Sequence, residues 1–147
     1  MTEIKKQLLE HCNKILREKR DHLKEAMDDA QKGANEYGLP RDRYDSFRTQ
    51  LLRKRDMFAQ QLAAVGEQLQ TLEKISLKPL SKAGFGALVI TENQKIFISV
   101  GLGKIELDGQ VYVAVSPVVP IARELENKSK GESFTINGKS FTIIDIL

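Results

Sequence analysis

The sequence has few of the residues that build disulfide, zinc or membrane proteins. Among its 147 residues there are one cysteine, Cys12, and two histidines, His11 and His22. One cysteine excludes an internal disulfide framework, and three such side chains cannot make a four-ligand zinc site. No apolar run approaches the roughly 18 residues that a membrane-spanning helix needs. Since Met1–Lys6 does not begin a signal peptide, we expect a cytoplasmic protein.

The motifs of several common enzyme classes are absent as well. The chain contains no GxxxxGK[ST], GxSxG or HExxH pattern, which leaves phosphate-loop, serine-hydrolase and zinc-protease functions without support. Its 23 basic and 20 acidic side chains give a formal net charge of +3. This small charge argues against general nucleic-acid binding.

Glycine and proline are distributed unevenly along the chain. Gly33, Gly38 and Gly66 are the only glycines before position 84, and Pro40 is the only proline before Pro79. The fold class predicted from this is α+β, with a helical first part and a second part rich in strands and turns. We expect a coiled-coil hairpin at 1–76, a linker at 77–82 and a small α+β domain at 83–147.

The first part carries apolar residues at the spacing of a helix face. They are Leu8, Cys12, Ile15, Leu23, Ala26 and Ala30, and then Tyr44, Phe47, Leu51, Phe58, Leu62, Val65, Leu69 and Leu72. From Phe58 the steps alternate four and three, which is typical of a coiled coil. Lys19 and His22 interrupt the first stripe. Gly33 to Pro40 separates the helices, so an antiparallel hairpin with its tip near 34–45 is expected. The alternative is dimerisation through the same seam.

The second part changes to the two-residue period of strands. β-Branched runs lie at 87–91, 95–100, 111–115 and 139–146, and Asn137-Gly138 is the strongest hairpin signal. A short helix is predicted over 121–127, with Pro120 in its first turn. Together these elements predict a twisted antiparallel sheet over a short helix. Alternation places Phe141, Ile143 and Asp145 on one face of the last strand, and Thr142, Ile144 and Ile146 on the other.

An ordered set of C-terminal residues forms a recognisable pattern. Ser116-Pro117 leads into Pro120-Ile121-Ala122 and Leu125, Lys128 to Glu132 follow with Gly131, and Gly138 and Ile143 to Ile146 close the chain. This set resembles the closing signature of the Gre family of bacterial transcription elongation (transcript cleavage) factors. The chain is similar to a divergent GreA/GreB-like member, by architecture throughout and by residues over roughly its last 35 positions.

The resemblance implies both a fold and a function. It implies an FKBP-like C-terminal domain that docks on RNA polymerase, and a coiled coil that enters the polymerase secondary channel. Acidic residues at the coiled-coil tip would help to hold the second catalytic Mg²⁺ of polymerase, which then cleaves its own backtracked RNA. The factor itself would be a monomer, would have no cofactor of its own and would not be an enzyme with a complete site.

Asp42 and Asp45 are the candidate tip residues, both as catalytic assistants and as ligands of a Mg²⁺ shared with polymerase. They lie three residues apart where the second helix begins, so they share a face at the end of the helix that favours anions. Arg41 and Arg43 depart from the family pattern and could pair with these carboxylates or contact phosphate. Three alternatives therefore stay open. The aspartates could be an ordinary helix cap, the protein could be a secondary-channel regulator that does not stimulate cleavage, or it could be a coiled-coil interaction or scaffold protein.

Other charged residues have two interpretations each. Glu36 is a possible third tip acid, and Asp28-Asp29 is more typical of a solvated helix face. Two basic clusters could contact polymerase or backtracked RNA, or could form an ordinary ion-pair surface: Arg17, Lys19, Arg20 and Lys24 on the first helix, and Arg48, Arg53, Lys54 and Arg55 on the second. We expect His11, His22 and Cys12 to be seam or flank residues and not ligands.

Overall fold

The computed structural model describes residues 2–36 and 45–147. Its contacts divide the chain into two compact units. One unit combines Met1–Cys12 with Thr71–Leu147, and the other is Asn13–Gln70. No helix among the described residues is long and apolar enough to cross a membrane. The domain boundaries expected at 76/77 and 82/83 stay predictions.

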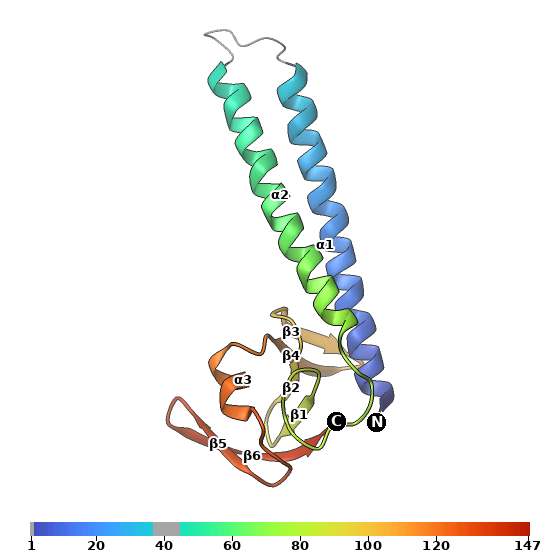
Figure 1. Ribbon diagram of the computed structural model, residues 1–147, viewed down its shortest axis with the longest axis vertical. Helices are drawn as coiled ribbons and strands as arrows, with labels where there is room; N and C mark the ends of the chain where they lie inside the picture. Colours follow the sequence, from blue (N-terminus) through green and yellow to red (C-terminus); the bar gives the residue numbers. More distant parts are fainter. Residues whose placement is uncertain (1, 37–44) are drawn as a thin grey trace. The chain divides into compact units, whose positions relative to one another are not determined.

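Two long helices make up the unit Asn13–Gln70 and extend beyond it. Helix α1 spans Thr2–Glu36 and helix α2 spans Asp45–Glu73. They lie side by side in Figure 1. A Cβ atom placed on Gly33 would lie 3.3 Å from Cδ1 of Leu51, and Nη1 of Arg55 donates a hydrogen bond to Oε1 of Gln31. Because the contacting positions rise in α2 as they fall in α1, the helices are antiparallel, which confirms the predicted hairpin.

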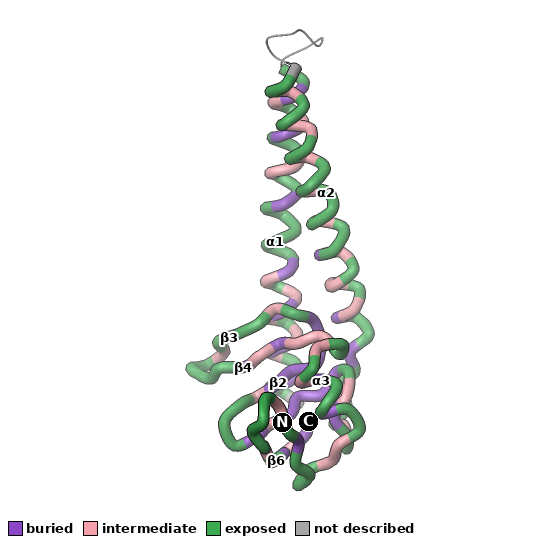
Figure 2. The backbone as a smooth tube through the Cα atoms, turned by 90° about the vertical axis from the view of Figure 1, so that its left-hand side faces the viewer, coloured by how far each residue is buried: buried purple, intermediate pink, exposed green. Residues whose placement is uncertain are grey.

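The seam between the helices is narrow and departs from the predicted stripe at several residues: Leu16 and Ala34 were not predicted, and Phe47, predicted in the seam, is 50% exposed. On α1 of this unit the buried side chains are Leu16, Leu23, Ala30 and Ala34, and on α2 Val65 is buried. Ile15, predicted in the seam, is only half-buried, because the heptad step from Leu16 to Leu23 selects its neighbour. Lys19 and His22 are exposed. Figure 2 shows separate purple patches of buried residues along the helices, between pink half-buried and green exposed segments.

The other unit contains a six-stranded sheet and a short helix. Its elements are β1 (Leu88–Thr91), β2 (Lys95–Ile98), β3 (Gly103–Leu107), β4 (Gln110–Val115), α3 (Pro120–Leu125), β5 (Ser133–Ile136) and β6 (Lys139–Ile146). The strand order is β3-β4-β2-β1-β6-β5. The predicted short helix, with Pro120 in its first turn, is confirmed.

The sheet is mixed, so the expectation of a wholly antiparallel sheet is wrong at one pair. Strands β2 and β4 run parallel, with Ile96 opposite Val113. The sequence interpretation missed β3, which occupies the sheet edge and pairs antiparallel with β4. Strand β3 runs opposite to β4, and the hairpin between them reverses the chain. Strand β4 therefore runs in the same direction as β2 and pairs with it in parallel.

Two hairpins are formed by residue pairs in left-handed conformations. Asp108 and Gly109 have φ of 52° and 76°, and Asn137 and Gly138 have φ of 50° and 77°. Positive φ at both central residues is the geometry of the type I′ turn, whose twist matches that of paired strands. The hairpin predicted at Asn137-Gly138 is therefore confirmed.

A bulge in β6 overturns the predicted alternation of its last residues. Asp145 pairs with Ile90 and Ile143 with Thr91, so Ile144 has no partner position on β1. An extra residue of this kind reverses the alternation beyond it. Ile143 and Ile146 are consequently both buried, whereas Ile144 is 49% exposed.

The main core of this unit lies between the sheet and α3. It contains Val89, Ile96, Ile98, Ala122, Leu125, Phe134, Ile143 and Ile146, among others. Rings of Phe134 and Phe141 lie 5.5 Å apart between centroids. Leu88 and Phe97 are opposite each other and fully buried, and by alternation they point to the other face of the sheet.

Two buried hydroxyl groups provide a test of this core. Oγ1 of Thr91 accepts from the Gln94 N–H at 3.0 Å and contacts the Gln94 carbonyl at 3.1 Å, whereas Oγ of Ser99 has no partner among the described residues. We predict that Thr91→Val lowers the free energy of unfolding by about 1–3 kcal/mol, because it removes the two hydrogen bonds that this buried hydroxyl makes with Gln94. Ser99→Ala should leave it unchanged or raise it. Urea unfolding followed by circular dichroism measures both, and equal losses would contradict the prediction.

Candidate functional site

The described structure reaches the two helix ends that border the predicted tip. Glu36 is the last residue of α1 and is exposed. Asp45 is the first residue of α2, but its side chain lies outside what the structure describes. Asp42 lies in 37–44, outside the described residues altogether, as do Arg41 and Arg43. The assignment of Asp42 and Asp45 as tip ligands therefore stays a prediction.

The donor chemistry of this pair suits Mg²⁺ but does not complete a site. Carboxylate oxygens are ligands that Mg²⁺ accepts, usually one or two beside several waters. Within 2–36 and 45–147, no group of three or more histidine, cysteine or acidic side chains lies close enough to hold a metal ion. Asp28 and Asp29 are exposed on α1, in keeping with a solvated face. A metal ion bound by Asp42 and Asp45 would need further ligands from a partner.

A group of cations follows the hairpin, and we call it the cationic belt. It consists of Arg17, Lys19, Arg20 and Lys24 on α1 and Arg48, Arg53, Lys54 and Arg55 on α2. Arg48 and Arg55 are half-buried, and the other six are exposed. Two arginines of the belt pair with acids next to them in the sequence, Arg20 with Asp21 at 3.5 Å and Arg55 with Asp56 at 2.7 Å. Both pairs lie on the surface, where such pairs contribute little stability.

Charge is most uneven in the first half of α2. Between Ser46 and Gln60 the helix carries the four cations of the belt and one acid, Asp56. Nε of Arg48 is buried without a partner among the described residues. This stretch of α2 presents a local excess of positive charge that attracts phosphate groups.

Lys5 is a buried cation in the unit that contains the sheet. Its side chain is 1% exposed, and Nζ donates to the Lys78 carbonyl at 3.2 Å and to the Leu147 main-chain oxygen at 3.4 Å. Leu147 is itself paired with Leu88 through two main-chain hydrogen bonds. Lys5 thus ties the first turn of α1 to the segment after α2 and to the sheet. Burial lowers the pKa of Lys5 from its usual value of 10.5.

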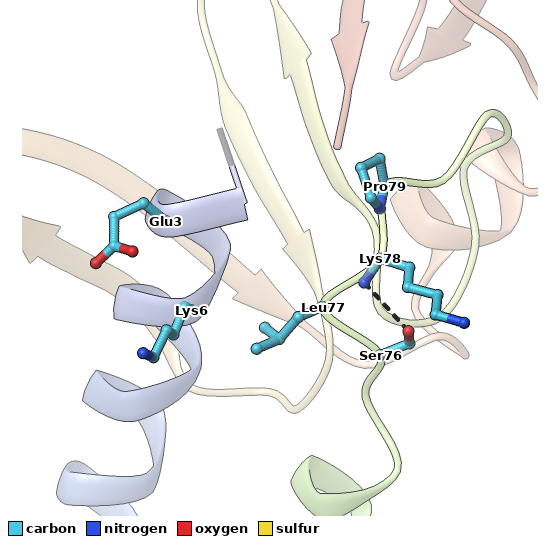
Figure 3. A pocket seen from close by; sticks show the side chains of 6 residues that line it. All are labelled: Glu3, Lys6, Ser76, Leu77, Lys78 and Pro79. Carbon is cyan, nitrogen blue, oxygen red and sulfur yellow. Dashed lines mark hydrogen bonds between the residues drawn. The ribbon is translucent and has the colours of Figure 1, made fainter.

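A pocket of about 600 Å³ opens beside this cation. It is lined by Glu3, Lys6, Ser76, Leu77, Lys78 and Pro79. Figure 3 shows Leu77 directed toward α1, and the Lys78 N–H donating to Oγ of Ser76. The lining holds two lysines and a glutamate but no pairing of a nucleophile with a base.

The single thiol of the protein is unsuited to nucleophilic chemistry. Cys12 is fully buried, and burial raises the pKa of its thiol to about 11. Little thiolate is present at neutral pH. His11 is half-buried and His22 is exposed.

The C-terminal residues that carry the family resemblance have identifiable structural roles. Pro120 begins α3, and Gly131 has φ of 90°, a conformation that glycine adopts without strain. Oε1 of Glu132 accepts from the Ser129 N–H at 3.2 Å. Pro120 thus starts α3, and Gly131 and Glu132 shape the segment that connects α3 to β5.

Sequence reasoning missed an apolar patch around the entry to α3. Val118 is 65% exposed and Phe85 38% exposed. A small cavity of about 90 Å³ is lined by Gly84, Phe85, Ile98, Pro117, Ala122 and Glu126, and Val118 follows Pro117 in the sequence. We call Phe85, Pro117 and Val118 the apolar patch. Exposed apolar side chains that cluster in this way are typical of binding surfaces. Their positions in the chain have no common period, so no sequence pattern indicated them.

A two-helix hairpin followed by a mixed sheet with one short helix defines the class of fold. No protein-family model matches the sequence, and no curated protein matches it. Among solved structures it is similar to the GreA factor homolog 1 (Gfh1) protein of Thermus thermophilus, with 17% identity, 95% of this chain and 94% of that chain covered, and a TM-score of 0.35. A second structure, of the transcription factor Gfh1, is 18% identical over 94% of this chain and 92% of that one, with a TM-score of 0.34. Both likenesses are distant.

The lowered pKa of Lys5 predicts how stability changes with pH. The folded state releases this proton at lower pH than the unfolded state, so the free energy of unfolding should rise as pH increases toward 10.5. We predict that Lys5→Met removes this rise, whereas Lys6→Met, at the exposed neighbour, preserves it. Urea unfolding at a series of pH values gives the free energy of unfolding of each variant and of the wild type. Because all three proteins contain Cys12, its titration cancels when a variant is compared with the wild type. Identical pH profiles for the two variants would contradict the assignment.

Proposed function

We propose that this chain is a Gre-like transcription elongation factor that binds RNA polymerase and inserts its helical hairpin into the secondary channel. There it stimulates cleavage of backtracked RNA or modulates elongation. The observation that carries the proposal is the hairpin, because α1 and α2 flank the acidic segment 36–45 on paired antiparallel helices. The C-terminal residues that resemble the family signature support the same function.

In this proposal the hairpin lends carboxylates to polymerase. Asp42 and Asp45 contribute oxygen ligands to a Mg²⁺ that polymerase also holds, and the bound ion would help to activate water for phosphodiester cleavage. The chain supplies ligands and position and needs no cofactor of its own. It acts as a monomer in the cytoplasm, where transcript and polymerase are available.

Two surfaces of the described structure fit the remaining requirements. The cationic belt has the charge to contact the phosphates of backtracked RNA or the acidic groups of the channel. The apolar patch offers exposed side chains for docking on a protein surface, where buried apolar groups provide most of the binding energy. Each surface belongs to a different compact unit, so insertion and docking can be tested separately.

Two other functions have specific support. Arg41 and Arg43 flank Asp42 in the sequence and could neutralise it, which favours a secondary-channel regulator that does not stimulate cleavage. Phe47 and Met57 are 50% and 46% exposed on α2, which favours a coiled-coil interaction or scaffold protein with a further helix as partner. Sedimentation that shows a concentration-independent monomer would count against this last function.

Acidic substitutions test the cleavage role. We predict that Asp42→Ala and Asp45→Ala each reduce RNA release from a stalled elongation complex at least roughly tenfold, as loss of a metal-site group does. Binding to core polymerase in a pull-down should be unchanged. The controls are Asp28→Ala and Asp29→Ala, which remove exposed acids from α1 and should have no effect on cleavage. Binding by the wild type without any stimulation of cleavage would leave only the regulator function.

A substitution in the apolar patch tests docking. Val118→Asp should weaken binding to core polymerase by about 2 kcal/mol, or roughly thirtyfold, because a carboxylate would be desolvated at the contact. Ile144→Asp, at another exposed apolar side chain, on β6, is the control and should bind as the wild type does. Equal loss in both variants would exclude a specific role for the patch.

A further inference from the structure

The sheet ends in two edge strands, β3 and β5, and β5 is the more open to pairing. Strand β5 pairs with β6 on one side, with Ser133 opposite Thr142 and Thr135 opposite Ser140. The order of strands leaves its other side free of any described strand. Ser133 and Thr135 are both exposed.

The register shows which main-chain groups of β5 face the free side. The N–H of Thr142 donates to the Glu92 carboxylate at 3.2 Å and therefore points away from β5. Ser133 and Thr142 therefore form a non-hydrogen-bonded pair of the antiparallel ladder. In such a pair, both residues direct their N–H and C=O groups away from the partner strand. Ser133 and, two residues on, Thr135 thus present an N–H and a C=O each to the free edge.

The two edges of the sheet differ in how they are protected. At β3 the hairpin register makes Lys104 and Glu106 the residues with outward main-chain groups, and both side chains are charged and exposed. Charged side chains on an edge strand discourage pairing with another chain. The equivalent positions on β5 carry the small uncharged side chains of Ser133 and Thr135. No proline or charge in Ser133–Ile136 blocks an added strand.

Cations lie at both ends of this open edge. Lys128 and Lys130 precede β5, and Lys139 follows its turn; Lys130 and Lys139 are exposed. Oε1 of Glu132, next to Ser133, accepts from the Ser129 N–H at 3.2 Å, and the carboxylate keeps its charge. Helix α3 adds Arg123 and Glu124, and Glu126 follows it. Against these acids, the three lysines at the strand ends leave a small local excess of positive charge. Their charge complements a segment with acidic side chains.

We propose that the free edge of β5 binds an extended, acidic polypeptide segment as an added strand. The outward N–H and C=O groups of Ser133 and Thr135 pair with the main chain of the segment, and its carboxylates lie near Lys130 and Lys139. This binding surface shares no residue with the apolar patch. Main-chain pairing provides affinity in such strand addition, and flanking side chains provide selectivity.

A synthetic strand peptide serves as the probe. The probe is a fluorescein-labelled acetyl-Glu-Val-Glu-Val-Glu-Val-Glu-amide, and its counterpart has lysine in place of each glutamate. Fluorescence anisotropy should show that the acidic probe binds the full chain and the basic probe binds at least roughly tenfold more weakly. Amide signals of Ser133 and Thr135 should gain protection from hydrogen exchange on binding of the acidic probe.

Two variants at one position separate main-chain pairing from side-chain contact. Thr135→Pro removes an outward N–H, which has no partner on β6, so the β5–β6 ladder is kept and proline is tolerated on an edge. It should weaken binding of the acidic probe roughly tenfold, since a paired acceptor loses its donor. Thr135→Ala, the control, keeps the N–H and should bind as the wild type does. Lys130→Glu with Lys139→Glu should reverse the preference between the two probes.

Several outcomes would overturn the proposal. Equal binding by Thr135→Pro and Thr135→Ala would show that main-chain pairing is not used. Equal affinity for acidic and basic probes, or no binding of either at millimolar concentration, would remove the assigned partner. A concentration-dependent dimer that Thr135→Pro abolishes would assign the edge to a second copy of the chain instead.

Discussion

The constraint on which the structure depends is that a two-helix hairpin can bury only one narrow stripe on each helix. Leu16, Leu23, Ala30 and Ala34 fill that stripe on α1, and Val65 is its fully buried counterpart within the unit on α2. The other described positions of the hairpin in this unit are half-buried beside the stripe or exposed to water. The high charge of the chain follows from this geometry, because polar side chains are required wherever no partner covers the helix.

The same constraint explains why the ends of the hairpin need support from elsewhere. The first turns of α1 belong to the compact unit of the sheet, where Lys5 bonds to main-chain oxygens and Leu8 and Cys12 are buried. A buried lysine is tolerated there because two acceptors partly replace its lost hydration. The first turns of α1 are therefore part of the core of the sheet unit and not of the seam between the helices.

How far the sequence predicts the fold depends on the range of each interaction. Asn137-Gly138 and Pro120 act within a few residues, so the last hairpin and the start of α3 were predictable. Strand β3 was missed because its few apolar residues give weak alternation and it gains its place only by pairing with β4. The tip carboxylates, by contrast, were predicted from spacing and resemblance, and Asp42 lies outside the described residues. The cationic belt was recognised as a set of residues, but the partial burial of Arg48 and Arg55 required coordinates.

The sequence by itself determined the two helices, the hairpin turns and the division into a helical and a sheet-forming part, because local periodicity and turn chemistry decide these. Only the tertiary structure decided that Leu16 and not Ile15 enters the seam, that β4 runs parallel to β2, and that a bulge at Ile144 buries Ile146. It also brought Phe85 beside Pro117 and left β5 at an edge of the sheet of described strands. These features depend on which distant segment each residue meets, and such partners are chosen by the packing of the whole unit.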